Sequence, residues 1–436
     1  MSKFLAFLRV HHADAAILLF LAAGCIGIAS QIMLPVMPGA EMIKLAENLV
    51  AHGAYANPFG TLATGPTAVN PPLYPWLLSI LFRIFRLPAY VYVASIMLAT
   101  LANAFTASLL PRLSQTILGD CVPGVFAGIF WLAAMQSIPG WDTNLSVLGI
   151  LVFCLITHPT GMAGRFPLRA AILGGVLAGI LFLLNPSVIL IIVPWIAFLW
   201  WSAGNFKLRS LREPLILLGI WGLFWFGWSL RNYVELGAFV VRTNLGMTLY
   251  ASNNDCAGST LIRDEFNNCY QSHHPNASVD EARILASMGE VRYDRARVAD
   301  TKAWVLSHPM RFASLTLDRF VEFWFPAADW IPPTKKFQNA FSIPHYAQKW
   351  SRQQMRIAYG VWAITALSIP GFILLAMRRQ GVILYFLVVL SIYPLMYYVV
   401  VADVRYRYPV LWISLLAAGY FVTELLKGRQ RDRVVA

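Results

Sequence analysis

Long apolar runs recur along most of this chain, and they constrain its fold more than any other feature of the sequence. Each run holds about 17 to 22 residues, enough for a helix to cross the hydrocarbon core of a membrane. Hydrophobic residues make up 58% of the 436 positions, charged residues only 13%, and the mean hydropathy is +0.60. The sequence lacks the alternating short strands that are typical of transmembrane β-barrels. We therefore expect an all-α polytopic membrane protein.

The apolar runs predict about ten transmembrane helices. The first run is not followed by a signal-peptide cleavage site and a soluble chain, so we interpret it as a retained span. The run at 71–85 is short and bounded by prolines, and we expect it to lie at the membrane surface without crossing. The predicted spans are 15–35, 89–110, 120–138, 143–158, 169–184, 186–203, 213–231, 356–377, 380–401 and 408–426.

The basic residues indicate how the chain is oriented. Short basic connections recur on one side of the spans, as the positive-inside rule predicts for cytoplasmic loops. Both termini are then cytoplasmic, the number of spans is even, and two long polar segments, 36–88 and 232–355, face outward. The same rule explains most of the net charge of +13, so nucleic-acid binding is not expected. The predicted localisation is a bacterial inner membrane, with membrane lipids as partners. The two outward-facing segments, and any active site that they form, then face the periplasm.

This topology divides the chain into three parts. Residues 1–231 form an N-terminal transmembrane module that includes the first outer loop, 36–88. Residues 232–355 form a long outer-face loop, and residues 356–436 form the C-terminal transmembrane helices. Amphipathic patterns predict helices in the outer loops at 38–55, 278–309 and 311–326. In the second of these, Ser278 and Glu281 match a capping box at the helix start.

Two cysteines, Cys256 and Cys269, share the long outer loop. The compartment that we assign to this loop is oxidising, so we expect a disulfide between them. The alternative is two free thiols in a reducing compartment. No CxxC motif or Cys/His cluster indicates a zinc site.

Charged residues avoid the middles of the predicted spans. Ion-coupled transporters usually keep ionisable groups inside the membrane, so this pattern argues against transport. It fits either a site at the outer surface or a purely structural membrane protein. The charged candidates at the outer face are Glu41, Glu47, Asp142, Arg231, Asp403, Arg405 and Arg407.

Each of these candidates also has a structural interpretation. Glu47 fits a solvated helix face, and Asp142 can cap the helix that follows it. Arg231 and Arg407 can anchor their helices at the interface beside aromatic residues. Taken together, they place carboxylates and guanidinium groups on one side of the membrane. Glycosyl transfer from a lipid phosphate needs this combination, since an acid must deprotonate the acceptor hydroxyl and arginines must hold the phosphate.

Six stretches, in this order and spacing, resemble the membrane glycosyltransferases of the GT-C fold. The resemblance extends over nearly the whole chain and points to the branch related to protein O-mannosyltransferases and lipid A aminoarabinose transferases. It implies a GT-C-like helical bundle, a polyprenyl-phosphate-linked sugar donor and transfer on the non-cytoplasmic side. The stretches are "AEMIKLAENLVAHGAY" with "NPPLYPWLLSILFRIF", "WDTNL", "WSLRNYVELGAFVVRTNLGMTLYASNN", "HPMRFASLTLDRFVEFWFP" and "VRYRYPVLWISLLAAGY".

The chain departs from the family pattern at two positions. Relatives carry an aspartate at the start of the opening helix, where this chain has Pro38, and the nearest acid is Glu41, one helical turn on. Relatives of the aminoarabinose type have a basic residue before "PPL", where this chain has Asn70. Either Glu41 replaces the family acid, or the chain is a scaffold that has lost the reaction.

The resemblance assigns a role to each candidate. Glu41 is the expected general base, and Asp142 is expected to support the acceptor or a metal ion. The expected phosphate ligands are Arg231, Arg405 and Arg407, with Asn70 beside the donor. The family leaves room for a divalent metal, and the acceptor is a lipid, a polysaccharide or a protein. The alternatives are a non-catalytic GT-C-like scaffold that binds lipid-linked sugar, and a transporter or flippase.

Overall fold

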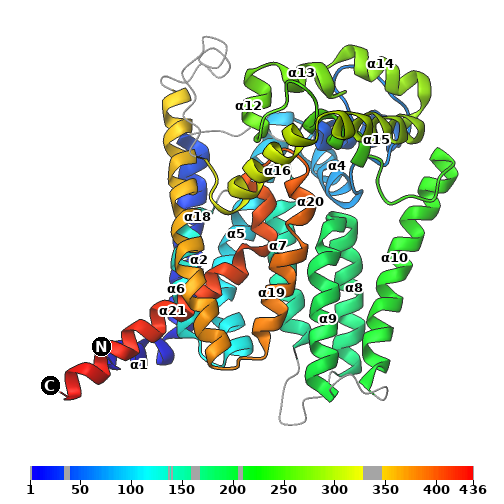
Figure 1. The fold of residues 1–436 in the computed structure, drawn as a ribbon. Helices are drawn as coiled ribbons and strands as arrows, with labels where there is room; N and C mark the ends of the chain where they lie inside the picture. Colours follow the sequence, from blue (N-terminus) through cyan, green and yellow to red (C-terminus); the bar gives the residue numbers. More distant parts are fainter. Residues whose placement is uncertain are drawn as a thin grey trace.

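The computed structural model describes residues 2–33, 40–135, 138, 141–158, 167–204, 210–327 and 346–435. Helices dominate these residues (Figure 1), and between the helices the only extended pairing among the described residues is two isolated bridges, Ala56–Pro66 and Thr260–Ala402. The expectation of an all-α chain is confirmed for this part of the sequence.

Apolar helices form a bundle that follows the predicted spans closely. Within the described residues, five helices are long and apolar enough to cross a membrane, and six further apolar helices are shorter. The predicted membrane character is therefore confirmed, whereas the number of crossings stays a prediction. The bundle helices are α2 (His12–Met33), α5 (Pro88–Leu118), α6 (Val122–Ala134), α7 (Thr143–Thr157), α8 (Leu168–Leu184), α9 (Ile189–Gly204), α10 (Arg212–Leu236), α18 (Tyr346–Met377), α19 (Val382–Ile392) and α21 (Tyr408–Val435).

Small residues let the central helices of the bundle approach one another closely. A Cβ atom on Gly419 of α21 would lie 2.0 Å from the main-chain oxygen of Pro123 on α6, and one on Gly124 would lie 2.3 Å from that of Leu110 on α5. Such glycines are typical of membrane helices, where packing rather than hydrophobicity drives association. The buried side chain of Trp412 lies in the same core.

The polar segments gather at one end of the bundle, which we call the loop end. Figure 1 shows the helices of both polar segments there, whereas α1 (Ser2–Val10) and the end of α21 lie at the opposite end. This arrangement agrees with an even number of crossings. The loop-end helices are α3 (Ala40–His52), α4 (Leu73–Phe85), α11 (Leu245–Ser252), α12 (Leu261–Phe266), α13 (Cys269–His273), α14 (Val279–Met288), α15 (Glu290–Ser307) and α16 (Pro309–Trp324).

The opening amphipathic helix is shorter than the range predicted for it. Helix α3 runs from Ala40 to His52, and its apolar face is buried through Met42 and Leu45, which are 1% and 0% exposed. Val50, at the end of the same pattern, is 40% exposed. Helix α3 packs against α4, and α4 in turn packs against α5 and α8.

The helix predicted over 278–309 is two helices. Gly289 separates α14 from α15, with a φ of 79° that favours glycine. The predicted cap is present, since the Ser278 hydroxyl accepts the Glu281 N–H at 3.3 Å. The Glu281 carboxylate, however, binds Arg297 at 2.7 Å instead of closing the reciprocal half of the capping box.

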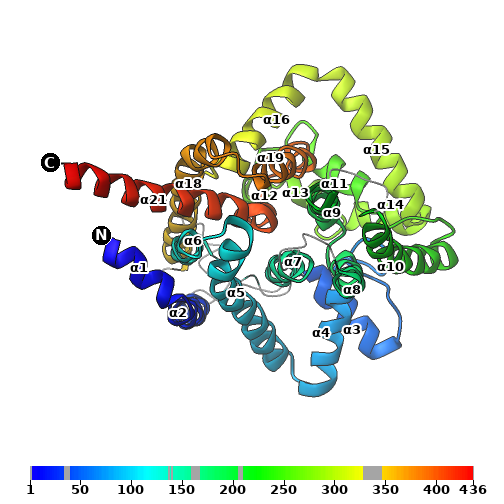
Figure 2. The same ribbon diagram turned by 90° about the horizontal axis from the view of Figure 1, so that it is seen from below.

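The chain turns again into α16, and this turn shapes the loop end. Seen from below in Figure 2, α15 and α16 meet at an angle along the rim of the molecule. Helix α16 then packs on α18, on α20 (Leu395–Tyr398) and on the 3-10 helix η3 (Val404–Arg407). The polar loop end is thereby joined to the C-terminal part of the bundle.

Candidate functional site

Glu41 lies near the start of α3, and two residues far away in the sequence face its carboxylate. The Asn70 amide donates a hydrogen bond to Glu41 Oε2 at 3.1 Å, and His274 Nε2 lies 4.0 Å from Glu41 Oε1. The Glu41 side chain is 13% exposed. Two of the predicted site residues, Glu41 and Asn70, are therefore in direct contact, although they are 29 positions apart.

His274, which follows α13, was not identified from the sequence. Its Nδ1 accepts the Asn276 N–H at 3.1 Å, so the neutral ring carries its proton on Nε2, toward Glu41. Burial lowers the pKa of His274, and the negative charge of Glu41 opposes this effect. The Tyr270 ring stacks on it with centroids 4.6 Å apart. Glu41 thus faces a neutral N–H donor held in place by packing.

Asp142 stands at the start of α7, in the cap position that the structural interpretation assigned to it. Its carboxylate makes no cap hydrogen bond to the helix backbone. Instead, Oδ2 accepts from Ser146 Oγ at 3.0 Å and from Asn185 Nδ2 at 2.9 Å. Burial raises the pKa of Asp142, and these two hydrogen bonds act in the opposite direction. The carboxylate is therefore held by Ser146 of α7 and by Asn185, which follows α8, with its charge poorly solvated.

Arg242 connects the two acids, and the sequence analysis did not select it. It lies on the loop after α10, where Nε donates to the Val69 main-chain oxygen at 2.9 Å. Burial lowers the pKa of Arg242, while the charges of Asp142 and Glu41 both raise it. The side chain is therefore close enough to both carboxylates for their charges to interact. The signal that was available is the stretch "VVRTNLG" within one of the motifs that carry the family resemblance.

Arg405 interacts with Asp142 from the C-terminal part of the chain. It pairs with Asp403 at 3.1 Å, and its guanidinium group lies 4.0 Å from the ring centroid of Trp141. Two arginines, Arg242 and Arg405, are thus placed around the carboxylates at the loop end.

Arg231 and Arg407 hold main-chain groups. Arg231 donates to the oxygens of Thr67 and Tyr55 at 2.7 and 3.0 Å. Arg407, only 2% exposed, donates at 2.7 Å to the main-chain oxygen of Trp324. Arg231 therefore fixes the first polar segment and Arg407 fixes the end of α16. Arg231 and Arg407 therefore have structural roles. Of the three arginines predicted to bind phosphate, Arg405 is the one whose charge interacts with Asp142.

A buried glutamate joins the two polar segments beside the site. Glu290 Oε1, at the start of α15, accepts the Ala68 N–H at 2.7 Å and a hydrogen bond from the Thr243 hydroxyl. Burial raises the pKa of Glu290, and these hydrogen bonds lower it. Because Thr243 follows Arg242 directly, this contact also positions the arginine. Pro38, where relatives carry their acid, lies outside the described residues.

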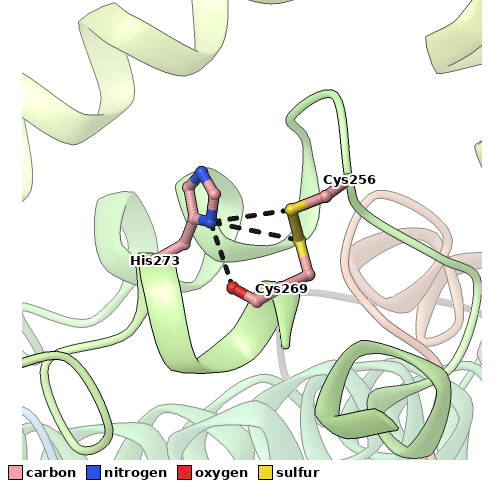
Figure 3. A group of neighbouring side chains, drawn as sticks. All are labelled: Cys256, Cys269 and His273. Atoms are coloured by element: carbon pink, nitrogen blue, oxygen red, sulfur yellow. Dashed lines mark hydrogen bonds between the residues drawn. A yellow bond between two sulfur atoms is a disulfide. The ribbon is translucent and has the colours of Figure 1, made fainter. Parts of the chain in front are cut away.

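The residues of the disulfide also belong to the group of side chains that most resembles a metal site. Cys256 and Cys269 are joined by a disulfide with their Cα atoms 5.6 Å apart, and His273 Nδ1 faces the two sulfur atoms (Figure 3). Among the described residues, this trio is the one group of three side chains with the spacing of metal ligands. The disulfide removes its thiolates as ligands, and neither Glu41 nor Asp142 belongs to such a group, so the residues described do not fit a divalent metal.

Comparisons with known proteins place the fold. No family model matches this chain, and no curated protein matches it in sequence. Among solved structures, the archaeal oligosaccharyltransferase AglB from Archaeoglobus fulgidus, in complex with an inhibitory peptide and a dolichol-phosphate, is 12% identical with a TM-score of 0.54. The match covers 96% of this chain and 51% of that protein.

Two further structures of the same archaeal enzyme give a similar result. The form tethered to an acceptor peptide with the NVT sequon is 12% identical, has a TM-score of 0.51 and covers 99% of this chain and 51% of that one. The complex with Zn and sulfate is 13% identical, has a TM-score of 0.52 and covers 94% and 49%. This chain therefore spans about half the length of these proteins, and over that half it shares the GT-C fold of a membrane glycosyltransferase.

Proposed function

We propose that this protein is a glycosyltransferase that moves a sugar from a polyprenyl-phosphate-linked donor to an acceptor on the non-cytoplasmic face of the membrane. The observation that carries the proposal is that the charge of Arg242 interacts with those of Glu41 and Asp142, and the charge of Arg405 with that of Asp142, at the loop end of a GT-C fold. The dolichol-phosphate and peptide in the AglB complex support a lipid-phosphate donor in general terms. The order of the sequence motifs further supports the branch related to protein O-mannosyltransferases and lipid A aminoarabinose transferases.

Glu41 is the general base in this proposal. Its carboxylate takes the proton of the acceptor hydroxyl as that oxygen forms a bond to the anomeric carbon of the donor sugar. The bond between the anomeric carbon and the phosphate oxygen breaks, and the polyprenyl phosphate leaves with the electron pair. Asn70 fixes one carboxylate oxygen through its 3.1 Å hydrogen bond, and neutral His274 lies beside the other. A fixed, hydrogen-bonded carboxylate is already oriented for proton transfer.

The arginines stabilise the leaving phosphate. Arg405 and Arg242 carry permanent charges, and guanidinium groups bind phosphate oxygens through paired N–H donors. Both interact with Asp142, which keeps positive charge at the site balanced while no phosphate is present. Asp142 orients the two arginines and can accept a hydrogen bond from the acceptor. No step is assigned to a metal ion, because the described side chains do not form a ligand set around the acids.

The proposed orientation follows the basic loops of the sequence. Both termini are cytoplasmic, and the loop end faces the periplasm of a bacterial inner membrane. Cysteine-accessibility labelling at position 87, just after α4, tests this orientation. Labelling only from the cytoplasmic side would invert the topology and remove the proposed placement of the site.

The function itself is tested in two steps. Deletion of the gene in its host should remove one sugar from an envelope glycan, as measured by mass spectrometry. The purified protein should then transfer a radiolabelled sugar from polyprenyl phosphate to extracts of the deletion strain. Donor binding without transfer, for every native donor tried, would favour the scaffold. Counterflow of lipid-linked sugar across sealed vesicles would favour a flippase.

A further inference from the structure

A pocket opens on the loop end beside α13, and Glu41 is not among its lining residues. It has a volume of about 500 Å³, within the range of small-ligand sites. His273, the last residue of α13, lines the pocket, while the next residue, His274, faces Glu41. The lining residues are Tyr250, Asn253, Asn254, Asp255, Cys256, His273, Asp300 and Trp304.

The pocket has a rigid floor. Asn253 and Asn254 are 1% and 6% exposed, and their side-chain amides donate to main-chain oxygens of α11. Asn253 Oδ1 also accepts from the buried Arg319 at 3.0 Å. The disulfide at Cys256 ties this floor to α13. Because the floor is held by internal bonds, the pocket is formed before any ligand arrives.

Aromatic rings form its walls. Tyr250 and Trp304 are both half-buried and come from α11 and α15. Arg297 covers one side of the Tyr250 ring at 4.3 Å from its centroid, and Trp304 Nε1 donates to Asp255 Oδ1 at 2.8 Å, which fixes both the indole and the carboxylate. His308 stacks on the Trp304 ring, with centroids 5.2 Å apart. The C–H face of a sugar ring would pack on the remaining aromatic surface, where the two rings line the pocket.

Hydrogen-bond acceptors surround these rings. The carboxylates of Asp255 and Asp300 are exposed at the rim. His273 Nδ1 donates to the Cys269 main-chain oxygen at 3.0 Å, so in the neutral ring Nε2 is an acceptor, and Figure 3 shows it directed away from the disulfide. A ligand with several hydroxyl donors matches this set.

The charges exclude phosphate and other anions. Arg297, which covers the Tyr250 ring, pairs with Asp300 at 2.8 Å and with Glu281 at 2.7 Å, so two carboxylates already neutralise it. Arg319 lies behind the floor, fully buried, and donates to Asn253 Oδ1 and to the Gly258 main-chain oxygen. The rim therefore presents negative charge, in contrast to the arginines around Glu41. We propose that this pocket binds an uncharged saccharide unit and that, if the transfer proposed above takes place, this unit belongs to the acceptor. The assignment to the acceptor rests on the proposed function, whereas saccharide binding does not.

Saturation-transfer NMR on the purified full-length protein in nanodiscs tests the proposal. The probes are lactose, maltose and chitobiose, with sialyllactose and glucose 6-phosphate as charged counterparts. We expect at least one neutral disaccharide to bind, and the charged probes to bind at least tenfold more weakly. The absence of a signal from all three neutral probes, or equal binding of the charged ones, would overturn the proposal.

Variants locate the binding. Trp304→Leu should raise the Kd of the neutral probe by about tenfold, because the aromatic surface is lost. Asp255→Asn keeps an oxygen acceptor for the Trp304 N–H but removes a negative charge. It should therefore reduce the difference in affinity between the neutral and the charged probes. The matched control is Asp280→Asn on α14, whose exposed carboxylate lies outside the pocket. If Trp304→Leu lowers the melting temperature, its loss of binding can come from misfolding, and the binding of the probes to Asp255→Asn is used instead. Unchanged binding in both folded variants refutes this pocket as the site.

The readouts separate this proposal from the proposed function. Binding of the neutral probes is measured without donor, so it survives even if no transfer is found. Transfer with full activity in variants that have lost saccharide binding would refute the acceptor role of the pocket while leaving the glycosyltransferase proposal intact.

Discussion

Replacing Glu41 with glutamine isolates the charge of the proposed general base. Glutamine has nearly the same shape, and its amide oxygen can still accept the hydrogen bond that Asn70 gives at 3.1 Å. The apolar face of α3 does not change, since Met42 and Leu45 stay buried. The variant should therefore fold normally and bind the donor, and it should lose only the group that accepts the proton.

The expected loss follows from what a positioned base contributes. General base catalysis is typically worth about 10²–10⁴-fold, which corresponds to roughly 3 to 5 kcal/mol in the activation barrier. Transfer of radiolabelled sugar at saturating donor should fall by that factor in Glu41→Gln, with the donor Kd within about twofold of the wild type.

The same helix provides the control. Glu47 pairs with Lys44 at 2.7 Å, and both side chains are more than 40% exposed. Exposed pairs of this kind contribute about 0–1 kcal/mol, so Glu47→Gln should leave transfer nearly unchanged. If Glu41→Gln keeps full activity, Glu41 is not the base. If the two variants lose activity equally, the effect comes from α3 as a whole and the reasoning from the Asn70 contact fails.

Three further predictions concern the rest of the loop end. Removing the disulfide by Cys256→Ser should lower stability by about 3 kcal/mol, which is measured as a lower melting temperature. Dithiothreitol should lower the melting temperature of the wild type in the same way, and equal melting temperatures of Cys256→Ser and the wild type would refute the prediction. Arg405→Ala should weaken donor binding by more than tenfold with little change in melting, whereas Arg407→Ala should mainly lower the melting temperature, because it removes the buried hydrogen bonds that Arg407 gives to the Trp324 oxygen and the Thr365 hydroxyl; the reverse pattern would contradict the assignment. Asp264, in α12, is 1% exposed and accepts the Gly258 N–H. Burial raises its pKa from 3.8 to about 6, so its contribution to stability is present below pH about 4 and lost as the pH rises through 6; Asp264→Asn should flatten the dependence of melting on pH between 4 and 7, and an unchanged profile would exclude this carboxyl.

The sequence alone predicted the helices of the bundle well. Each crossing depends on a contiguous apolar run, so hydropathy locates it without knowledge of its neighbours. The same local reasoning predicted α3, α16 and the cap at Ser278, because helix periodicity and capping involve residues within one or two turns. It did not identify the break at Gly289, since a glycine inside a helical pattern is often tolerated and only the backbone shows the positive φ.

The sequence selected only some of the residues that we place in the proposed site. Glu41, Asn70, Asp142 and Arg405 were selected because charge and motif order marked them out in the sequence. Arg242 was missed, although it interacts with both acids. A single arginine on a polar loop looks the same in the sequence whether it faces solvent or a buried carboxylate.

The tertiary structure decided which charged groups meet. His274 approaches Glu41 across more than two hundred positions, and Glu290 binds Ala68 over a separation of 222. It also separated Arg405, which faces Asp142, from Arg407, which is buried against Trp324, although the two are neighbours in one short stretch. Local propensity and hydropathy report on a residue and its neighbours in the chain. The charge, hydration and hydrogen bonds of a site depend on segments distant in sequence, and only folding brings those segments together.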